Sequence, residues 1–112
     1  MTVFILRCGD RYALRQRPED GLLAGLWEFP HLPGKLTLEQ ALAWAQEAGL
    51  HPRQLLRQTE KKHIFTHIQW QMQGIYLEVD HMAQTFTWLT ARQIGETAAL
   101  PTAFRQFWLE LM

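Results

Sequence analysis

The stretch from His63 to Val79 constrains the fold of this chain more than any other feature of the sequence. Its side chains alternate in character, and a period of two residues indicates an extended chain with two unlike faces. Gly74 is expected to interrupt or bulge this stretch. One face is expected to carry Ile64, Thr66, Ile68, Trp70 and Met72, and the other His67, Gln69, Gln71 and Gln73. The pattern predicts an extended chain that forms long strands.

Turn signals divide the remaining β-type sequence into shorter elements. Gly9-Asp10 is typical of a hairpin turn, and the Pro and Gly residues of 17–21 indicate a loop. Apolar, β-branched and aromatic runs between such signals predict strands. These are Thr2–Arg7, Arg11–Gln16, a short strand within Gly25–Pro30, and Thr85–Leu89.

Two helices are expected, with a short helical turn before the second. Thr37 followed by Gln40 forms a capping-box pattern ahead of a helix over 38–48, and Gly49 sits where a C-terminal glycine belongs. A short helical turn is expected over Ala91–Ile94. After Pro101 a final helix presents one apolar side, made of Phe104, Phe107, Trp108 and Leu111. The order of elements predicts a single α/β (α+β) domain over 1–112, with helices packed on the faces of a mixed β-sheet.

Charge and cysteine content exclude several classes of site. Eleven basic and eleven acidic side chains give a formal net charge of zero, so any contact with DNA must come from a local patch. Cys8 is the only cysteine, which excludes an intrachain disulfide, a cysteine-only zinc site and an iron–sulfur cluster in this chain. No apolar stretch approaches the length of a membrane span, so we expect no membrane association and a cytoplasmic location.

The run Gly25-Leu26-Trp27-Glu28-Phe29-Pro30, followed by a helix ending in Gln46-Glu47-Ala48-Gly49-Leu50, resembles the Nudix hydrolase family. There a Gly-x-Trp-x-Phe-Pro strand leads to a helix bearing Arg-Glu-x-x-Glu-Glu-x-Gly, whose carboxylates hold divalent cations that activate water. Aligned on Gly49, this chain has Leu42, Ala43, Gln46 and Glu47 at the arginine and the three glutamate positions. One carboxylate cannot assemble such a site. The resemblance therefore implies a Nudix-like fold without a metal site or catalytic residues.

Over nearly its whole length, the chain also resembles the C-terminal domain of MutY-type adenine glycosylases. The motifs that carry it follow in order: Arg15–Pro18, Gly21–Pro30, His63–His67, Trp88-Leu89 and Ala99–Pro101. In that family a Phe-Ser-His loop reads 8-oxoguanine opposite a mispaired adenine. This chain has Phe65-Thr66-His67, which keeps the hydroxyl and adds a methyl group.

The resemblance implies roles for particular residues and partners. Phe65, Thr66, His67 and His63 are expected to contact the lesion, with Lys61 and Lys62 on DNA phosphates. The implied partners are duplex DNA holding 8-oxoguanine:adenine mispairs and an N-terminal glycosylase domain that carries a 4Fe-4S cluster and excises adenine. No cofactor is expected in this domain. The implied protein is a bacterial monomer that associates with the nucleoid during repair.

Several other interpretations of these residues stay open. Taken without the resemblance, Phe65 suits a core position, Thr66 an ordinary strand position and His67 a solvated one. His63 and His67 suit zinc only on a helix, because in an extended chain their rings lie about 13 Å apart. The basic residues Arg53, Arg57, Lys61 and Lys62 suit either a solvated edge or phosphate contact.

Two other functions are also weighed for the whole chain. One is an active Nudix hydrolase of an oxidised nucleotide, against which Leu42, Ala43 and Gln46 count. The other is a protein-interaction module without DNA contact. Trp27, Trp70 and Trp108 are expected in the core rather than as stacking platforms, because of their places in the strand and helix patterns.

Overall fold

A computed structural model describes residues 1–17, 25–65, 67–97 and 100–109 of the chain. Within them, one sheet follows the order β3-β2-β1-β6-β5, with β4 added beside β1 and β7 beside β2. The strands are β1 (Thr2–Cys8), β2 (Arg11–Gln16), β3 (Trp27–Glu28), β4 (His31–Leu32), β5 (Pro52–Phe65), β6 (Ile68–Val79) and β7 (Thr87–Thr90). The helices are α1 (Leu38–Glu47), α2 (Ala91–Thr97) and α3 (Thr102–Leu109).

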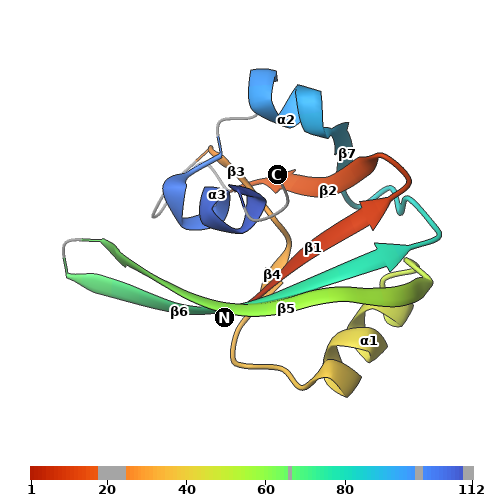
Figure 1. Ribbon diagram of the computed structural model, residues 1–112, viewed down its shortest axis with the longest axis horizontal. Helices are drawn as coiled ribbons and strands as arrows, with labels where there is room; N and C mark the ends of the chain where they lie inside the picture. The colour runs from red at the N-terminus through yellow and green to blue at the C-terminus, as the bar shows by residue number, and fades with distance from the viewer. Residues whose placement is uncertain (18–24, 66, 98–99, 110–112) are drawn as a thin grey trace.

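The sheet is mixed, as the sequence predicts. β1 and β6 run parallel, and the other pairings are antiparallel. Neighbouring residues of β1 enter separate cores: Val3 packs with residues of α3, and Phe4 packs with residues of α1. Helices α1 and α3 lie on opposite faces of the sheet (Figure 1). The expected α+β architecture is therefore confirmed.

The capping box that the sequence predicts is present at the N-terminus of α1. The Thr37 hydroxyl accepts a hydrogen bond from the backbone amide of Gln40, and the Gln40 side chain accepts one from the amide of Thr37. These bonds satisfy amides that a helix N-terminus otherwise leaves without partners. Ala41 and Ala45 are buried on the sheet side, and Trp44 stacks on Phe4 with ring centroids 4.1 Å apart.

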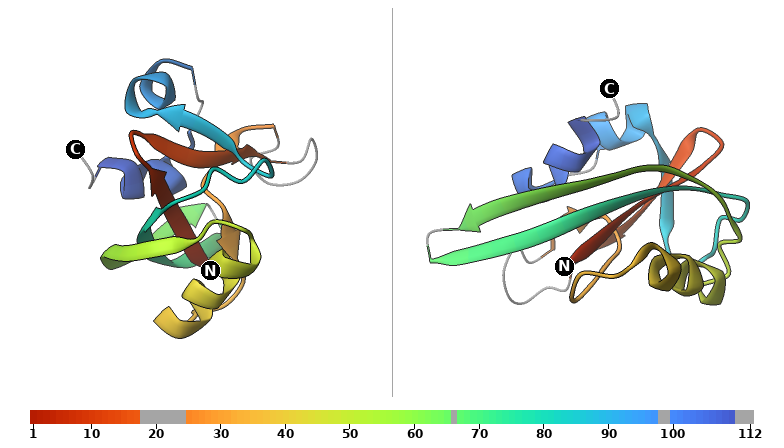
Figure 2. Two further views of the ribbon diagram at one scale, coloured as in Figure 1. Left: turned by 90° about the vertical axis from the view of Figure 1, so that its right-hand side faces the viewer. Right: turned by 60° about the horizontal axis from the view of Figure 1, so that its bottom comes forward.

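The expectation that the chain from His63 to Val79 is extended, with an interruption at Gly74, is wrong, because the chain reverses between Phe65 and Ile68. β5 ends at Phe65, β6 begins at Ile68, and the two pair antiparallel along their whole length. We call residues 60–65 and 68–73 the arm. It projects sideways beyond α1 and α3 (Figures 1 and 2). The expected grouping of Ile64 with Ile68 on one face is also wrong, because Ile64 lies opposite Gln69 and Ile68 lies opposite Phe65.

Gly74 does not interrupt β6; it stands in register between Thr59 of β5 and Val3 of β1. A methyl group added to Gly74 would lie 2.8 Å from the Phe107 ring and 2.9 Å from a Thr59 carbon. The glycine is therefore required by the close approach of α3, not by a bulge. The register shifts lie instead in β5, between Pro52 and Gln54 and between Leu55 and Arg57.

The other elements differ from the expected ones mainly in their ends. β7 begins at Thr87 rather than Thr85, and the expected helical turn extends to Thr97 as α2. The expected apolar side of α3 is confirmed for Phe104, Phe107 and Trp108, which are buried, and Leu111 lies outside the described residues. The loop expected over 17–21 also lies outside them, except for Arg17.

A buried charge cluster joins the body of the domain to the arm. The Glu28 side chain is only 5% exposed, and its oxygens accept hydrogen bonds of 2.7 Å from Arg15 Nε and from Arg17 Nη1. The Arg17 guanidinium lies over the ring of Trp70, a residue of the arm, at 5.4 Å from the ring centroid. His31 lies 3.6 Å from Glu28, and burial lowers the pKa of its imidazole, which keeps it neutral at pH 7.

We expect Gly74→Ala to lower the free energy of unfolding by about 2 kcal/mol, because Phe107 and Thr59 must move to admit the methyl group. Gly95→Ala is the matched control. It lies in α2 with open space around it, so it should leave stability unchanged or raise it by up to about 1 kcal/mol. Urea denaturation of both variants measures the difference. Equal stabilities would show that the contact between α3 and β6 is not tight.

We expect Glu28→Gln to lower the free energy of unfolding by about 3 kcal/mol, because it leaves two guanidinium groups without their buried anion. Glu96→Gln breaks an exposed ion pair with Arg92 and should cost less than about 0.5 kcal/mol. Thermal and urea unfolding of the two variants give the comparison. A loss at Glu28 no larger than the loss at Glu96 would contradict the structural role of the cluster.

Candidate nucleic-acid interface

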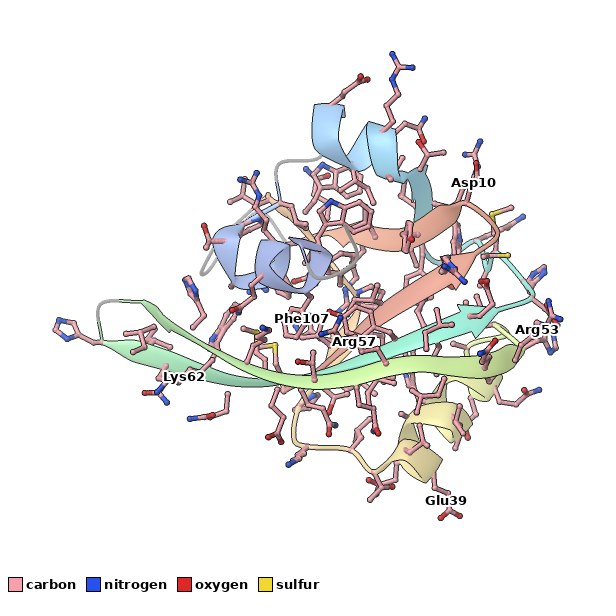
Figure 3. The ribbon with its side chains drawn as sticks, in the orientation of Figure 1. Asp10, Glu39, Arg53, Arg57, Lys62 and Phe107 are labelled. Atoms are coloured by element: carbon pink, nitrogen blue, oxygen red, sulfur yellow. The ribbon has the colours of Figure 1, made fainter. Side chains whose placement is uncertain are left out.

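The pairing register sorts the side chains of the arm onto two faces. Residues directly opposite in an antiparallel pair lie on the same face. The face toward α3 therefore carries Lys61 and His63 from β5, with Ile68, Trp70 and Met72 from β6. The face away from α3 carries Glu60, Lys62 and Ile64, with Gln69, Gln71 and Gln73. The neighbouring lysines 61 and 62 thus lie on opposite faces, and Figure 3 labels Lys62 on the arm.

The tip of the arm lies between Phe65 and Ile68. The backbones of these two residues pair, and His67 is exposed in the turn. Thr66 and the side chain of Phe65 lie outside the described residues. Ile64 and Ile68, on either side of the turn, are 60% and 49% exposed. The expected lesion-contacting segment therefore occupies the far end of a projecting hairpin.

The α3 face of the arm is braced by aromatic and charged contacts. Trp70 contacts both the Arg17 guanidinium, which lies over its ring, and the ring of Phe104, which it meets edge-on at 5.8 Å between centroids. His63, directly opposite Trp70, is half-buried. Trp70 is packed against the core of the domain rather than presented as an open stacking surface, which agrees with the sequence prediction.

The opposite face of the arm borders a pocket of about 570 Å³. Gly34 and Lys35 close it from the loop before α1, while Lys62 and Gln71 line it from the arm. Lys35 also forms an ion pair with Glu60 across the pocket. Gln73 fixes the loop, because its side-chain amide donates a 2.8 Å hydrogen bond to the carbonyl oxygen of Leu36.

Within the described parts of the chain, no three His, Cys, Asp or Glu side chains gather as a metal site would require. The glutamate positions of the Nudix helix fall on exposed residues of α1, namely Ala43, Gln46 and Glu47. Glu39 is the other carboxylate of α1. It lies eight residues before Glu47, about 12 Å along the helix, so the two cannot share an ion.

Sequence reasoning missed the contacts that hold the arm in place. Nothing in the order of residues places Arg17 over Trp70, since 53 positions separate them. It also missed Lys35 at the pocket. A usable signal was the glutamines at positions 69, 71 and 73, because strands with one polar face are common in antiparallel sheets. The basic stretch before His63 is the nearest candidate for the partner strand.

Comparison with known proteins identifies similar sequences of one kind. Adenine DNA glycosylases of Homo sapiens, Rattus norvegicus and Mus musculus are 37%, 32% and 31% identical to this chain, each over 88% of its length. The chain spans only 20–22% of the length of these relatives. None of the described helices is long and apolar enough to cross a membrane.

Solved structures and a family model identify the fold. A Nudix hydrolase from M. smegmatis, RenU, matches 98% of this chain and 81% of its own with a TM-score of 0.63 and 18% identity. The E. coli ORF135 protein matches 98% of this chain and 87% of its own with a TM-score of 0.57 and 16% identity. A family model described as "NUDIX domain" matches residues 2–110. The chain therefore belongs to the NUDIX domain family.

Proposed function

We propose that this chain is the lesion-recognition domain of an adenine DNA glycosylase and reads 8-oxoguanine opposite a mispaired adenine with the tip of its arm. The observation that carries the proposal is the similarity to three adenine DNA glycosylases over 88% of the chain. The position of His67 on the exposed end of a projecting hairpin supports it, because a reader must reach into a groove of the duplex.

The composition of α1 favours binding over hydrolysis. Pyrophosphate hydrolysis in this family needs clustered carboxylates for divalent cations. At the corresponding positions α1 has Ala43, Gln46 and Glu47, so two of the three carboxylates are missing. The chain thus keeps the NUDIX fold as a scaffold and uses it to bind a ligand rather than to cleave a bond.

The chemical difference between guanine and 8-oxoguanine suits a hydroxyl reader. Guanine has an acceptor at N7 and a hydrogen at C8, whereas 8-oxoguanine has a proton on N7 and a carbonyl oxygen at C8. A hydroxyl such as that of Thr66 both accepts from N7–H and donates to the oxygen, and a neighbouring backbone amide adds a donor. One such contact is worth about 1–3 kcal/mol of discrimination. His63, Phe65 and His67 flank Thr66 in this proposal.

The remaining four fifths of the parent protein supply the chemistry. Adenine excision needs a flipped base together with acid and carboxylate groups that act on it. We assign these to an N-terminal domain with a 4Fe-4S cluster, since the single Cys8 of this chain cannot hold one. Lys61 and Lys62 contact phosphates beside the lesion. The parent protein acts as a monomer in the bacterial cytoplasm, at the nucleoid.

We expect Thr66→Ala to reduce the preference of this chain for 8-oxoguanine:adenine over guanine:adenine duplexes by about tenfold, because one lesion-specific contact is lost. Thr66→Ser keeps the hydroxyl and should keep the preference. Fluorescence anisotropy with the two duplexes at low salt measures the ratio of dissociation constants, and backbone NMR shifts locate the contact.

Thr85→Ala is the control for this experiment, since Thr85 is exposed in the loop before β7, beyond the end of β6 that is opposite the tip. It should bind both duplexes as the unaltered chain does. A chain that binds neither duplex, or shifts that avoid residues 61–70, would contradict the proposed function. A preference unchanged in Thr66→Ala would refute the role of the hydroxyl alone.

We expect this chain alone to release no adenine from an 8-oxoguanine:adenine duplex and no pyrophosphate from 8-oxo-dGTP with magnesium. The reason is that the base-excising groups lie outside it and that α1 lacks the carboxylates. A single-turnover assay with denaturing electrophoresis tests the first reaction, and a phosphate-release assay tests the second. Turnover in either would refute the assignment of a purely binding role.

A further inference from the structure

β5 is the last strand on one side of the sheet. It pairs with β6, and in the part of the chain that the structure describes no other strand pairs with it. Figure 1 shows β5 along the border of the sheet. The strand extends over 14 residues, whereas strands of globular proteins commonly have about 5–6. A long strand at the edge of a sheet is a template for pairing with another extended chain.

The first part of β5 is irregular, and the part that follows is regular. Pro52 has no backbone amide hydrogen to donate. The two register shifts of the strand lie between Pro52 and Gln54 and between Leu55 and Arg57. Proline and bulges are two devices by which natural edge strands resist pairing with other chains. From Arg57 onward the register with β6 is unbroken. We call residues 57–62, which end before the tip of the arm, the edge segment.

The edge segment carries positive charge in a chain that has no net charge. β5 holds four basic side chains and one acidic side chain, a formal charge of +3, so the other residues of the chain together carry −3. The acidic residue, Glu60, forms an ion pair with Lys35. Arg57 and Lys61 lie on the face toward α3, and Lys62 lies on the other face. Figure 3 labels Arg57 and Lys62. The edge segment is therefore basic on both faces of the sheet.

Backbone and charge together select the partner of this edge. A second copy of the chain would place two basic strands side by side, and like charges on neighbouring strands destabilise their pairing. DNA phosphates suit the charge, but they only accept hydrogen bonds and cannot satisfy the carbonyl groups of a strand edge. An extended acidic peptide supplies amides, carbonyl groups and negative charge together. We propose that the edge segment of β5 binds an extended acidic segment of a protein partner as an additional strand of the sheet.

The first test offers three short synthetic peptides to the whole chain. One alternates glutamate with valine, and the second has lysine in place of glutamate. The third is the acidic peptide with N-methyl groups on two adjacent central residues, which removes a backbone donor from each of its edges and keeps its charge. The acidic peptide should slow hydrogen exchange at alternate backbone amides of residues 57–62, as measured by NMR. The other two peptides should bind at least about tenfold more weakly.

The second test removes positive charge from the edge segment. Arg57→Gln and Lys62→Gln change exposed residues, so the fold should be retained, which circular dichroism checks. Each variant should bind the acidic peptide about two- to fivefold more weakly, as expected for the loss of one exposed ion pair. Arg92→Gln is the matched control, because it removes an exposed basic side chain from α2. It should bind the peptide as the unaltered chain does.

Several outcomes would overturn the inference. Equal binding of the acidic peptide and its N-methylated form would mean that charge alone is recognised and that no strand is added. Equal binding by Arg57→Gln, Lys62→Gln and Arg92→Gln would place the peptide elsewhere on the chain. A DNA duplex that slows exchange of the amides of 57–62, where the acidic peptide slows none, would assign the edge to DNA.

The inference goes beyond the proposed function and uses no contact with the lesion. A chain that binds the acidic peptide at the edge segment but shows no preference for 8-oxoguanine would contradict the proposed function and support this inference. A chain that prefers the lesion and binds none of the peptides would do the reverse. Sedimentation that shows a dimer of the unaltered chain, which the acidic peptide does not dissociate and Arg57→Gln does, would assign the edge to self-association and overturn the inference.

Discussion

The contact between α3 and Gly74 sets the position of everything that projects from this domain. Phe107 packs where a side chain on Gly74 would otherwise stand, and the Tyr76 hydroxyl donates a 2.8 Å hydrogen bond to the Phe107 carbonyl oxygen. Trp70, four residues nearer the tip of the arm, meets Phe104 of the same helix. The hairpin is thus held firmly at its root and along one face, while its last residues extend beyond the core. Binding residues there can vary with little effect on packing.

The same logic explains why the Trp-Glu-Phe-Pro strand persists without hydrolase carboxylates. Glu28 is engaged by Arg15 and Arg17, and Arg17 in turn covers Trp70. The motif therefore supports the arm from the body of the domain. Removing the acids of α1 changes exposed positions alone and leaves this buried cluster intact, because α1 and α3 cover opposite faces of the sheet.

How far the sequence predicts the structure depends on how local each signal is. The capping box of Thr37 and the apolar side of α3 were predictable because both are set by residues a few positions apart. The hairpin was not, because the sequence between Phe65 and Ile68 has no Gly, Pro, Asn or Asp and lies inside an unbroken alternation. The first part of β5 was not predicted either. Its two register shifts, between Pro52 and Gln54 and between Leu55 and Arg57, interrupt the two-residue alternation by which a strand is recognised. The candidate site was predictable as a segment through the family resemblance, whereas its bracing by Arg17 depends on distant pairing.

The distribution of charge suggests that capture of a duplex and recognition of the lesion belong to different parts of the parent protein. The chain has no net charge, and several acids outside the arm lie in ion pairs with nearby arginines, such as Glu78 with Arg7 and Asp80 with Arg53. Beyond about 8 Å in physiological salt, little attraction toward DNA remains. The basic character of residues 61–67 acts only once the tip is close to phosphate. On the proposed function, the rest of the parent protein therefore supplies long-range affinity, and this domain adds a short-range test of one base.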